Sequence, residues 1–560
     1  MATERDDTGW EAISGRLTHV WERAAPVRDR VRARVTVDTR ALAVMRMALA
    51  TILLGDLAYR SLYLKEFYTD AGVYPLAAYE ATYIQYNGLS VHALSGDLWF
   101  QQLVFVVAGL FALALLLGYR TRLVGFVSFA LLISLHARNP ALLNGGDRLL
   151  GVILFVSLVA PLGERWSIDA LRRGEAREQR GASDASASNI ANGDDRSREQ
   201  VASVGTAAVL CQPIVVFTAN AMLKHRGESW YSGDALEVAL ANDTMTIFLG
   251  NSLAEYPTLL TLLNYGWILL LAGSVPFLLL TVGRLRALAV FAYLSAFTGM
   301  ALAMTVGVFP FTLAASVLPF LTTSFWAAVG RRVPESVRAR KPTVEMLGPL
   351  SNPPLERRLL DRLRDRGYED GADFAVAYAQ SFMTMAGLLV LTWMLLFAAD
   401  DVSGFEVPEQ IDSTHLDRQS WGLYAPDPSE SYSWFVPEAE LENGTRVHAF
   451  EGGPPDFDRP PDAAATYDSF RHRKFLQAVR DAGSGDTNGI IARSYADWVC
   501  RQANDRHDGA VEQVNIYRMF QLSPVGGEHP EPPTKLVVIR WECGQDPANP
   551  PEGRLAPAGS

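Results

Sequence analysis

Ionisable side chains interrupt the most apolar stretches of this sequence, and their spacing indicates buried ion pairs or an acid–base site. Arg46 and Asp56 fall inside an apolar run at 41–59, and Arg60 follows Asp56 by four residues. Residues spaced i and i+4 share one face of a helix, so Asp56 and Arg60 can pair there. A charge in an apolar helix is costly and usually has a reason. A structural ion pair is the favoured interpretation, and a role in a site is the alternative.

A second polar group follows the third apolar run, in the sequence HARNPALLNGGDRLL. Its polar members are His136, Arg138, Asn139, Asn144, Asp147 and Arg148. An aspartate near the start of a helix is ordinary capping chemistry. Two arginines on a side otherwise poor in arginine indicate instead a buried polar network or an anionic ligand. The sequence leaves both interpretations open.

A third group ends the fifth apolar run, where Lys224 and His225 precede Trp230. A lysine at a membrane boundary can be a plain anchor that extends its amine towards water. It can also be a base, because a partly desolvated amine gives up its proton more easily. These residues alone favour the anchor.

The elements that must position these groups are long apolar helices. A bilayer core needs about 20 apolar residues in helical form. Nine segments meet this need, at 41–59, 101–118, 122–138, 148–163, 203–223, 257–281, 286–306, 310–329 and 379–399. The segment at 148–163 is short, so we expect it to be tilted or re-entrant. A soluble protein buries one or two such segments, so the sequence predicts a polytopic α-helical membrane protein with about nine transmembrane helices.

Arginine marks one side of this predicted bundle. Positive charges cluster in the first 40 residues, at 120–122, at 165–180, at 284–286 and at 331–341, whereas the alternate loops are poor in arginine. Cytoplasmic loops carry the excess of Lys and Arg. With nine spans, this predicts a multi-pass protein of the cell membrane with a cytoplasmic N-terminus and an extracytoplasmic C-terminus.

The predicted organisation has five parts. They are a cytoplasmic segment at 1–40, a helical domain at 41–330, a cytoplasmic loop at 331–378, a last helix at 379–400 and an extracytoplasmic domain at 401–560. The polar stretch at 174–202 has no apolar period, which predicts a disordered linker.

The C-terminal part reads as a small α+β domain. Strands are predicted at 515–522 and 534–543, and helices at 469–482 and 494–504. We expect the proline-bounded stretch WGLYAPDPSESYSWF to dock on the outer surface. Cys500 and Cys543 are a candidate disulfide, but spacing alone leaves open whether they pair.

Composition excludes several classes of function. The net charge is −11 and lysine is scarce, as in proteins with an acidic surface adapted to high salt. The basic residues form short clusters beside apolar segments, which argues against a nucleic-acid partner. P-loop, dinucleotide, HExxH and nucleophile-elbow motifs are absent. Nine His and three Cys are scattered, so no metal site is expected.

Seven motifs in order resemble the HTTM domain, the membrane domain of vitamin K-dependent gamma-carboxylases and their prokaryotic relatives. They are VMRMALATILLGDLAYR, FYTDAGVYP, LGYRTR, RNPALLNGGD, PLGERWSID, LKHRGESWYSG and VGVFP, and together they cover about 38–330. The resemblance implies a site at the outer face where a lysine deprotonates a reduced lipid quinone of the vitamin K type. Lys224 is the residue that best matches that lysine.

Two departures set this sequence apart from the carboxylases. The carboxylases have a functional histidine in the loop that has the sequence NGGD here, and this loop has no histidine at the matching place. They have a second functional histidine in a later helix, where Phe297 stands in this sequence. The leading hypothesis is therefore an HTTM protein that, if an enzyme, oxidises a lipid quinol or carboxylates a polypeptide or envelope substrate. The second is a membrane scaffold that presents its outer domain to a partner. A transporter ranks last, because no inverted repeat is apparent.

Overall fold

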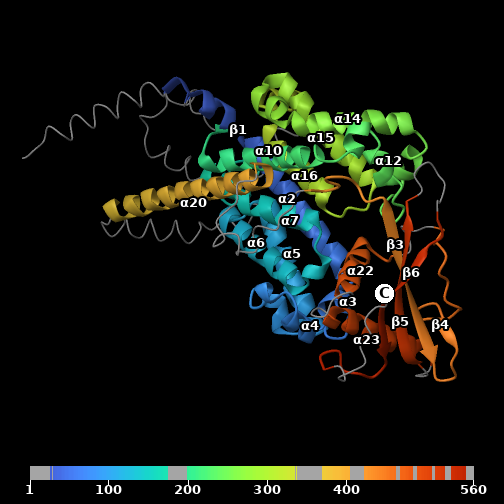
Figure 1. Cartoon of the computed structure of the whole chain (residues 1–560). Coiled ribbons are helices and arrows are strands. Elements are labelled where there is room, and N and C mark those ends of the chain that lie inside the picture. Colours follow the sequence, from blue (N-terminus) through green and yellow to red (C-terminus); the bar gives the residue numbers. More distant parts are fainter. Residues whose placement is uncertain are drawn as a thin grey trace, which may run out of the picture.

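The computed structural model describes residues 25–27, 29–174, 199–334, 336, 369–403, 422–461, 467–483, 489–507, 511–523 and 531–549. A bundle of helices makes up most of the chain, and a smaller domain with one sheet packs against one end of it (Figure 1).

Six helices in the described part of the chain are long and apolar enough to cross a membrane. They are α2 (Thr39–Ser61), α5 (Leu98–Leu117), α6 (Thr121–Arg138), α10 (Val204–Lys224), α15 (Gly283–Ala303) and the stretch Ala377–Leu396 of α20 (Glu369–Ser403). This makes the chain an integral membrane protein by length and composition of its helices. Helix α20 packs along α10 (Figure 1).

The other predicted spans are shorter or broken. The segment at 148–163 becomes α7 (Gly145–Ser157), 257–281 becomes α14 (Pro257–Ala272) followed by the π-helix η4 (Val275–Leu280), and 310–329 becomes α16 (Phe309–Val317), η5 (Leu318–Phe320) and α17 (Thr323–Arg332). The last series bends by 97°, so six helices of the described residues, or seven spans if this bent pair is one, pass on length and apolar composition. Pro276 and Pro319 lie at the irregular turns, and proline removes a backbone donor from the helix.

The described residues bear on two of the predicted boundaries. Most of the linker predicted at 174–202 lies outside the described residues, but its end is ordered: β2 (Gln200–Val201) pairs antiparallel with β1 (Val37–Asp38). Helix α20 begins at Glu369, and its apolar stretch Ala377–Leu396 agrees with the last helix predicted at 379–400. The residues at 337–368 lie outside the described part.

The bundle has two distinct ends. At the first, the β1–β2 pair, Arg34, Arg286 and Thr323 gather, and we call it the arginine-rich end. At the second, which we call the tail-facing end, the last turns of α2, α6 and α10 and the first turn of α7 meet the C-terminal domain. Short helices line the tail-facing end: α3 (Leu64–Tyr68), α4 (Leu76–Ala81), η1 (Ile84–Tyr86), η2 (Val91–Leu94), η3 (Pro140–Leu142), α11 (Ser229–Ser232), α12 (Ala235–Leu240) and α13 (Leu249–Leu253).

The C-terminal domain is an antiparallel sheet covered by two helices. Its strands β3 (Ser431–Leu441), β4 (Arg446–His448), β5 (Val511–Leu522) and β6 (Thr534–Glu542) lie in the order β4-β3-β5-β6. Helices α22 (Phe470–Gly483) and α23 (Gly489–Arg506) lie between the sheet and the bundle (Figure 1). The predicted α+β class, both helices and the last two strands are confirmed. The long central strand β3 was not predicted.

The candidate disulfide is present. Cys500 and Cys543 are bonded with an S–S distance of 2.08 Å and link α23 to the residue after β6. Cys211 is the remaining cysteine and is free, inside α10.

Candidate functional site

The predicted pair of Asp56 and Arg60 exists and is part of a larger cluster. The Nε of Arg60 donates to Asp56 Oδ2 at 2.7 Å, and its Nη2 donates to Asp147 Oδ1 at 2.6 Å. All three side chains are buried. The cluster therefore joins α2 to α7 through charges that water does not reach.

The C-terminal domain contributes the fourth charge. Arg471 of α22 donates through Nη2 to Asp56 Oδ1 at 2.6 Å and to Asp147 Oδ1 at 3.0 Å. We call Asp56, Arg60, Asp147 and Arg471 the four-charge cluster. Burial and the neighbouring Arg60 lower the pKa of Arg471, but the two carboxylates outweigh them and hold that pKa above its usual value. Two positive charges thus balance two negative ones at the junction of the two parts.

Asp147 also caps a helix, so both interpretations of its loop are right. Its backbone N–H donates to Asn144 Oδ1 at 3.0 Å, and the Asn144 N–H donates to Asp147 Oδ2 at 2.9 Å. This capping box begins α7. A Cβ on Gly146 would lie 2.5 Å from the Phe309 nitrogen, which explains the second glycine of the NGGD motif.

Arg138 and Asn139 hold a different segment. Arg138 Nη2 donates to the Tyr74 carbonyl at 3.0 Å, and Asn139 Nδ2 donates to the Phe67 carbonyl at 3.0 Å. The guanidinium of Arg138 also lies over the Tyr74 ring, 5.6 Å from its centroid. These two side chains fasten the FYTDAGVYP loop to the end of α6, and their contacts include neither Lys224 nor the four-charge cluster.

Lys224 is buried beneath residues from the C-terminal part of the chain. Its side chain is 2% exposed, and Nζ donates to the carbonyls of Leu423 at 2.7 Å and Tyr424 at 2.9 Å. The amine also lies 3.7 Å from the centroid of the Trp230 ring. Trp230 Nε1 donates to the same Tyr424 carbonyl at 3.0 Å. The predicted docking of the 421–435 stretch is thus correct for the segment 422–427, which we call the strap.

Asp427 secures the other end of the strap. It accepts from the backbone N–H of Ser229 at 2.9 Å and of Glu228 at 3.2 Å, and from the Ser229 hydroxyl. Burial raises the pKa of Asp427, but the hydrogen bonds from Ser229 and Glu228 and the charge of Lys224 together outweigh it and lower the pKa below its usual value. A Cβ on Gly227 would lie 2.1 Å from the Pro426 carbonyl, so only glycine permits this approach.

The remaining predicted residues take no part in the contacts between Lys224 and the strap. His225 is exposed, with its ring 5.2 Å from that of Tyr231. Phe297, which replaces an expected histidine, is buried and packs against Trp267 and Phe217. The predicted site residues therefore form three separate groups rather than one.

The fit of a quinol and of a metal can be tested on the described residues. The Lys224 amine is covered by the strap and by Trp230, so the residues around it do not fit a quinol unless the strap moves. Among the described residues, no group of three or more His, Cys, Asp or Glu side chains could hold a metal ion.

Sequence reasoning missed the partners that the C-terminal part supplies. Arg471 lies 324 residues from Asp147 along the chain, and Leu423 offers only a backbone carbonyl to Lys224. Any residue carries such a carbonyl, so residue type gives no signal for it. Arg471 lies in a predicted helix, but nothing distinguishes it there from its basic neighbours.

Comparison with protein-family models, with curated proteins and with solved structures found no match to this chain. The resemblance to the HTTM domain therefore stays a prediction from its motifs.

Proposed function

We propose that this chain is an HTTM-like integral membrane protein that holds its C-terminal domain against the outer ends of its helices and displays it to a partner outside the cell. The observation that carries the proposal is the insertion of Arg471 into the four-charge cluster. A buried charge that loses its partner is strongly destabilising, so each side of this junction depends on the other.

Further contacts extend the junction beyond the cluster. Arg473 donates through Nη2 to the Thr305 carbonyl at 3.1 Å, and the Phe470 ring stacks on Tyr59 with centroids 5.8 Å apart. The Tyr63 hydroxyl donates to the Asp468 carbonyl at 2.8 Å. Polar and aromatic contacts of this kind fix an orientation, as a display function requires.

The proposal includes nine crossings, with the N-terminus inside and the C-terminus outside. Helices α2 and α10 both run from the β1–β2 pair to the tail-facing end. The chain after α7 returns, because Val159 contacts Gly205 at the start of α10. Helix α7 alone has 13 residues. At 1.5 Å per residue it spans about 20 Å, so the irregular residues after it would complete that crossing.

The free edge of the sheet is the surface we assign to the partner, a polypeptide or an envelope polymer. Strand β6 is an edge strand, and Leu536 on it is 46% exposed. An edge strand offers unpaired N–H and C=O groups to an extended chain.

A photoreactive residue at Leu536 of the full-length protein, in its native membrane, tests this assignment. We expect one discrete crosslinked product, because the edge is the docking surface. Glu442, exposed in the turn between β3 and β4, is the matched control and should give none. No product from Leu536, or the same products from both positions, would contradict the display function.

A quinol-dependent enzyme is the second candidate, favoured by the surroundings of Lys224. No carboxylate lies within ion-pair distance of its amine in the described ranges, so the charged form rests on two carbonyls and a ring. A buried amine without a counter-ion is suited to act as a base when its cover opens. The experiment is turnover of reduced menaquinone with oxygen by the purified protein. Absence of turnover in the wild type, or unchanged turnover in Lys224→Ala, removes this candidate.

A further inference from the structure

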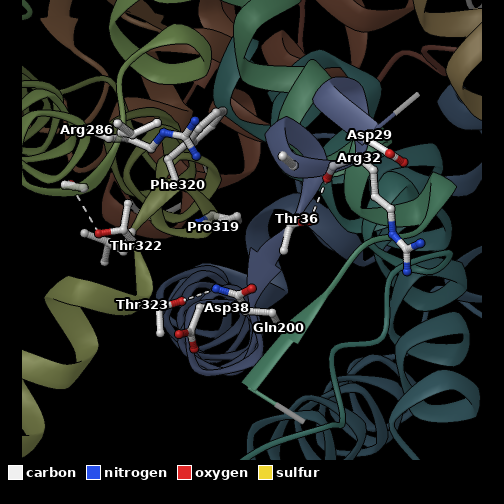
Figure 2. Close-up of a pocket in the computed structure, with 14 residues that line it drawn as sticks. Asp29, Arg32, Thr36, Asp38, Gln200, Arg286, Pro319, Phe320, Thr322 and Thr323 are labelled. Atoms are coloured by element: carbon white, nitrogen blue, oxygen red, sulfur yellow. Dashed lines mark hydrogen bonds between the residues drawn. The ribbon is translucent and has the colours of Figure 1, made fainter. Parts of the chain in front are cut away.

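A cavity of about 520 Å³ lies at the arginine-rich end, opposite the groups discussed above (Figure 2). Its walls come from four places: the segment that leads into α2, Gln200 of β2, the start of α15 and the break between η5 and α17. This volume lies in the range of small-molecule and headgroup sites.

Two helices begin at the cavity without side-chain caps. Gly283, the first residue of α15, and Thr323, the first residue of α17, both line it. Neither helix has a capping hydrogen bond from its N-cap side chain, and the Thr322 hydroxyl donates instead to the Gly283 carbonyl at 3.3 Å. The first N–H groups of a helix are unsatisfied and carry partial positive charge, so two converging helix starts favour an anion.

A buried arginine adds an unpartnered donor to the same wall. Arg286 is 8% exposed and lines the cavity. Its Nε donates to the Thr281 carbonyl and its Nη2 to the Leu279 carbonyl, each at 2.9 Å. Within the described part of the chain, its Nη1 has no acceptor. Arg32, across the cavity in Figure 2, has no carboxylate partner among the described residues either.

The carboxylates at the cavity do not cancel this positive character. Asp38 is engaged by Arg40, whose Nη2 and Nε donate to it at 2.7 and 2.9 Å, and it also caps α2. Asp29 is exposed on the leading helical turn. The positive charge at the cavity, from Arg32, Arg286 and the two helix starts, therefore exceeds the negative charge of Asp29.

An exposed apolar surface runs on from the cavity along α15. Val282, Leu285 and Leu288 are all largely exposed and lie at the start of that helix. We propose that the cavity binds the phosphate of an anionic membrane phospholipid, whose acyl chains lie along this face of α15. Basic pockets between transmembrane helices bind anionic headgroups in this way.

Lipid retention by the purified full-length protein tests the proposal. In native mass spectrometry, we expect phosphatidylglycerol to be retained over phosphatidylcholine. Arg32→Gln should weaken that retention by about fivefold, and Arg286→Gln by at least as much, since a basic residue near a lipid surface contributes about 1 kcal/mol. Arg284→Gln is the matched control, because Arg284 is exposed on the same helix but does not line the cavity.

Three outcomes would overturn the proposal. Equal retention of both lipids means that the cavity does not select an anion. Equal effects of Arg32→Gln and Arg284→Gln mean that general charge, not the cavity, holds the lipid. Inorganic phosphate that binds with the same dependence on Arg32, without competition from phosphatidylglycerol, indicates a site for a free anion. Arg32 is exposed, so its variant remains informative even where Arg286→Gln fails to fold.

Discussion

The two ends of the bundle contain the same types of charged residue but use them in opposite ways. At the tail-facing end, Arg60, Arg471 and Lys224 all donate to carboxylates or carbonyls within 3.0 Å, and all are buried. At the arginine-rich end, a cavity remains and Arg286 keeps a free nitrogen in the described structure. Buried guanidinium groups paired with carboxylates indicate a structural junction, whereas an unsatisfied donor beside an open volume indicates a binding site.

The C-terminal domain explains the difference. It supplies Arg471 to one pair of carboxylates and the Leu423 and Tyr424 carbonyls to Lys224. In the described part of the chain, the arginine-rich end receives such support from within the bundle. Arg46 is an example: its guanidinium donates to the carbonyls of Leu162 at 3.0 Å and Trp166 at 2.6 Å.

The largest expected effect comes from breaking the four-charge cluster. Arg471→Met leaves Asp56 and Asp147 with one arginine between them, and we expect it to lower the free energy of unfolding by about 3 to 5 kcal/mol. Thermal unfolding of the full chain in detergent measures this.

The control for that variant is Arg480→Met on the same helix. Arg480 pairs with its neighbour Asp481 at the surface, where we expect an effect below about 1 kcal/mol. Equal effects of the two substitutions would mean that the cluster does not hold the junction together. The tail-facing end would then not differ from an ordinary surface.

The disulfide should have the next largest effect, confined to the C-terminal domain. The double variant Cys500→Ser and Cys543→Ser opens a loop with a sequence separation of 43 residues. We expect it to destabilise the domain by about 2 to 4 kcal/mol, through the added conformational freedom of the unfolded chain. Calorimetry that resolves the domain from the bundle measures this.

Cys211→Ser is the matched control for the disulfide, because Cys211 is free and lies in α10. It should leave the transition of the C-terminal domain unchanged. If the double variant shifts both transitions equally, the two parts unfold as one unit. The junction would then be stronger than the domain that it holds.

The sequence predicts local features of this molecule far better than distant ones. The pair of Asp56 and Arg60 follows from helical spacing, and the cap at Asp147 follows from residue types. Apolar length predicts the six long helices, but it cannot foresee that 310–329 bends by 97° at the Pro319 turn. The hydrogen bonds of Lys224 go to backbone carbonyls about 200 residues away, and no pattern of side chains predicts them.

Residues that reach the same end of the bundle do not form one site. Lys224, Arg138 and Asp147 all reach the tail-facing end, as the charge pattern predicts, yet each has different partners there. Sharing one end of a bundle does not place residues within contact. The sequence does not predict the cavity at the opposite end, because the uncapped helix starts that line it are a feature of the backbone.

The smallest expected effect concerns pH and the strap. The pKa of Asp427 lies below that of an unfolded aspartate, because the hydrogen bonds from Ser229 and Glu228 and the charge of Lys224 together outweigh the effect of burial. The carboxylate therefore stabilises the docked strap fully above the unfolded pKa, and this contribution is lost as the pH falls through the folded one. Asp427 is exposed, so water screens its interactions and the effect is small. The protection of the Glu228 and Ser229 amides against hydrogen exchange, relative to the intrinsic rate at each pH, should fall on acidification more in the wild type than in Asp427→Asn. Exchange with the same pH dependence in both proteins would mean that Asp427 does not secure the strap, leaving Lys224 and Trp230 to hold it alone.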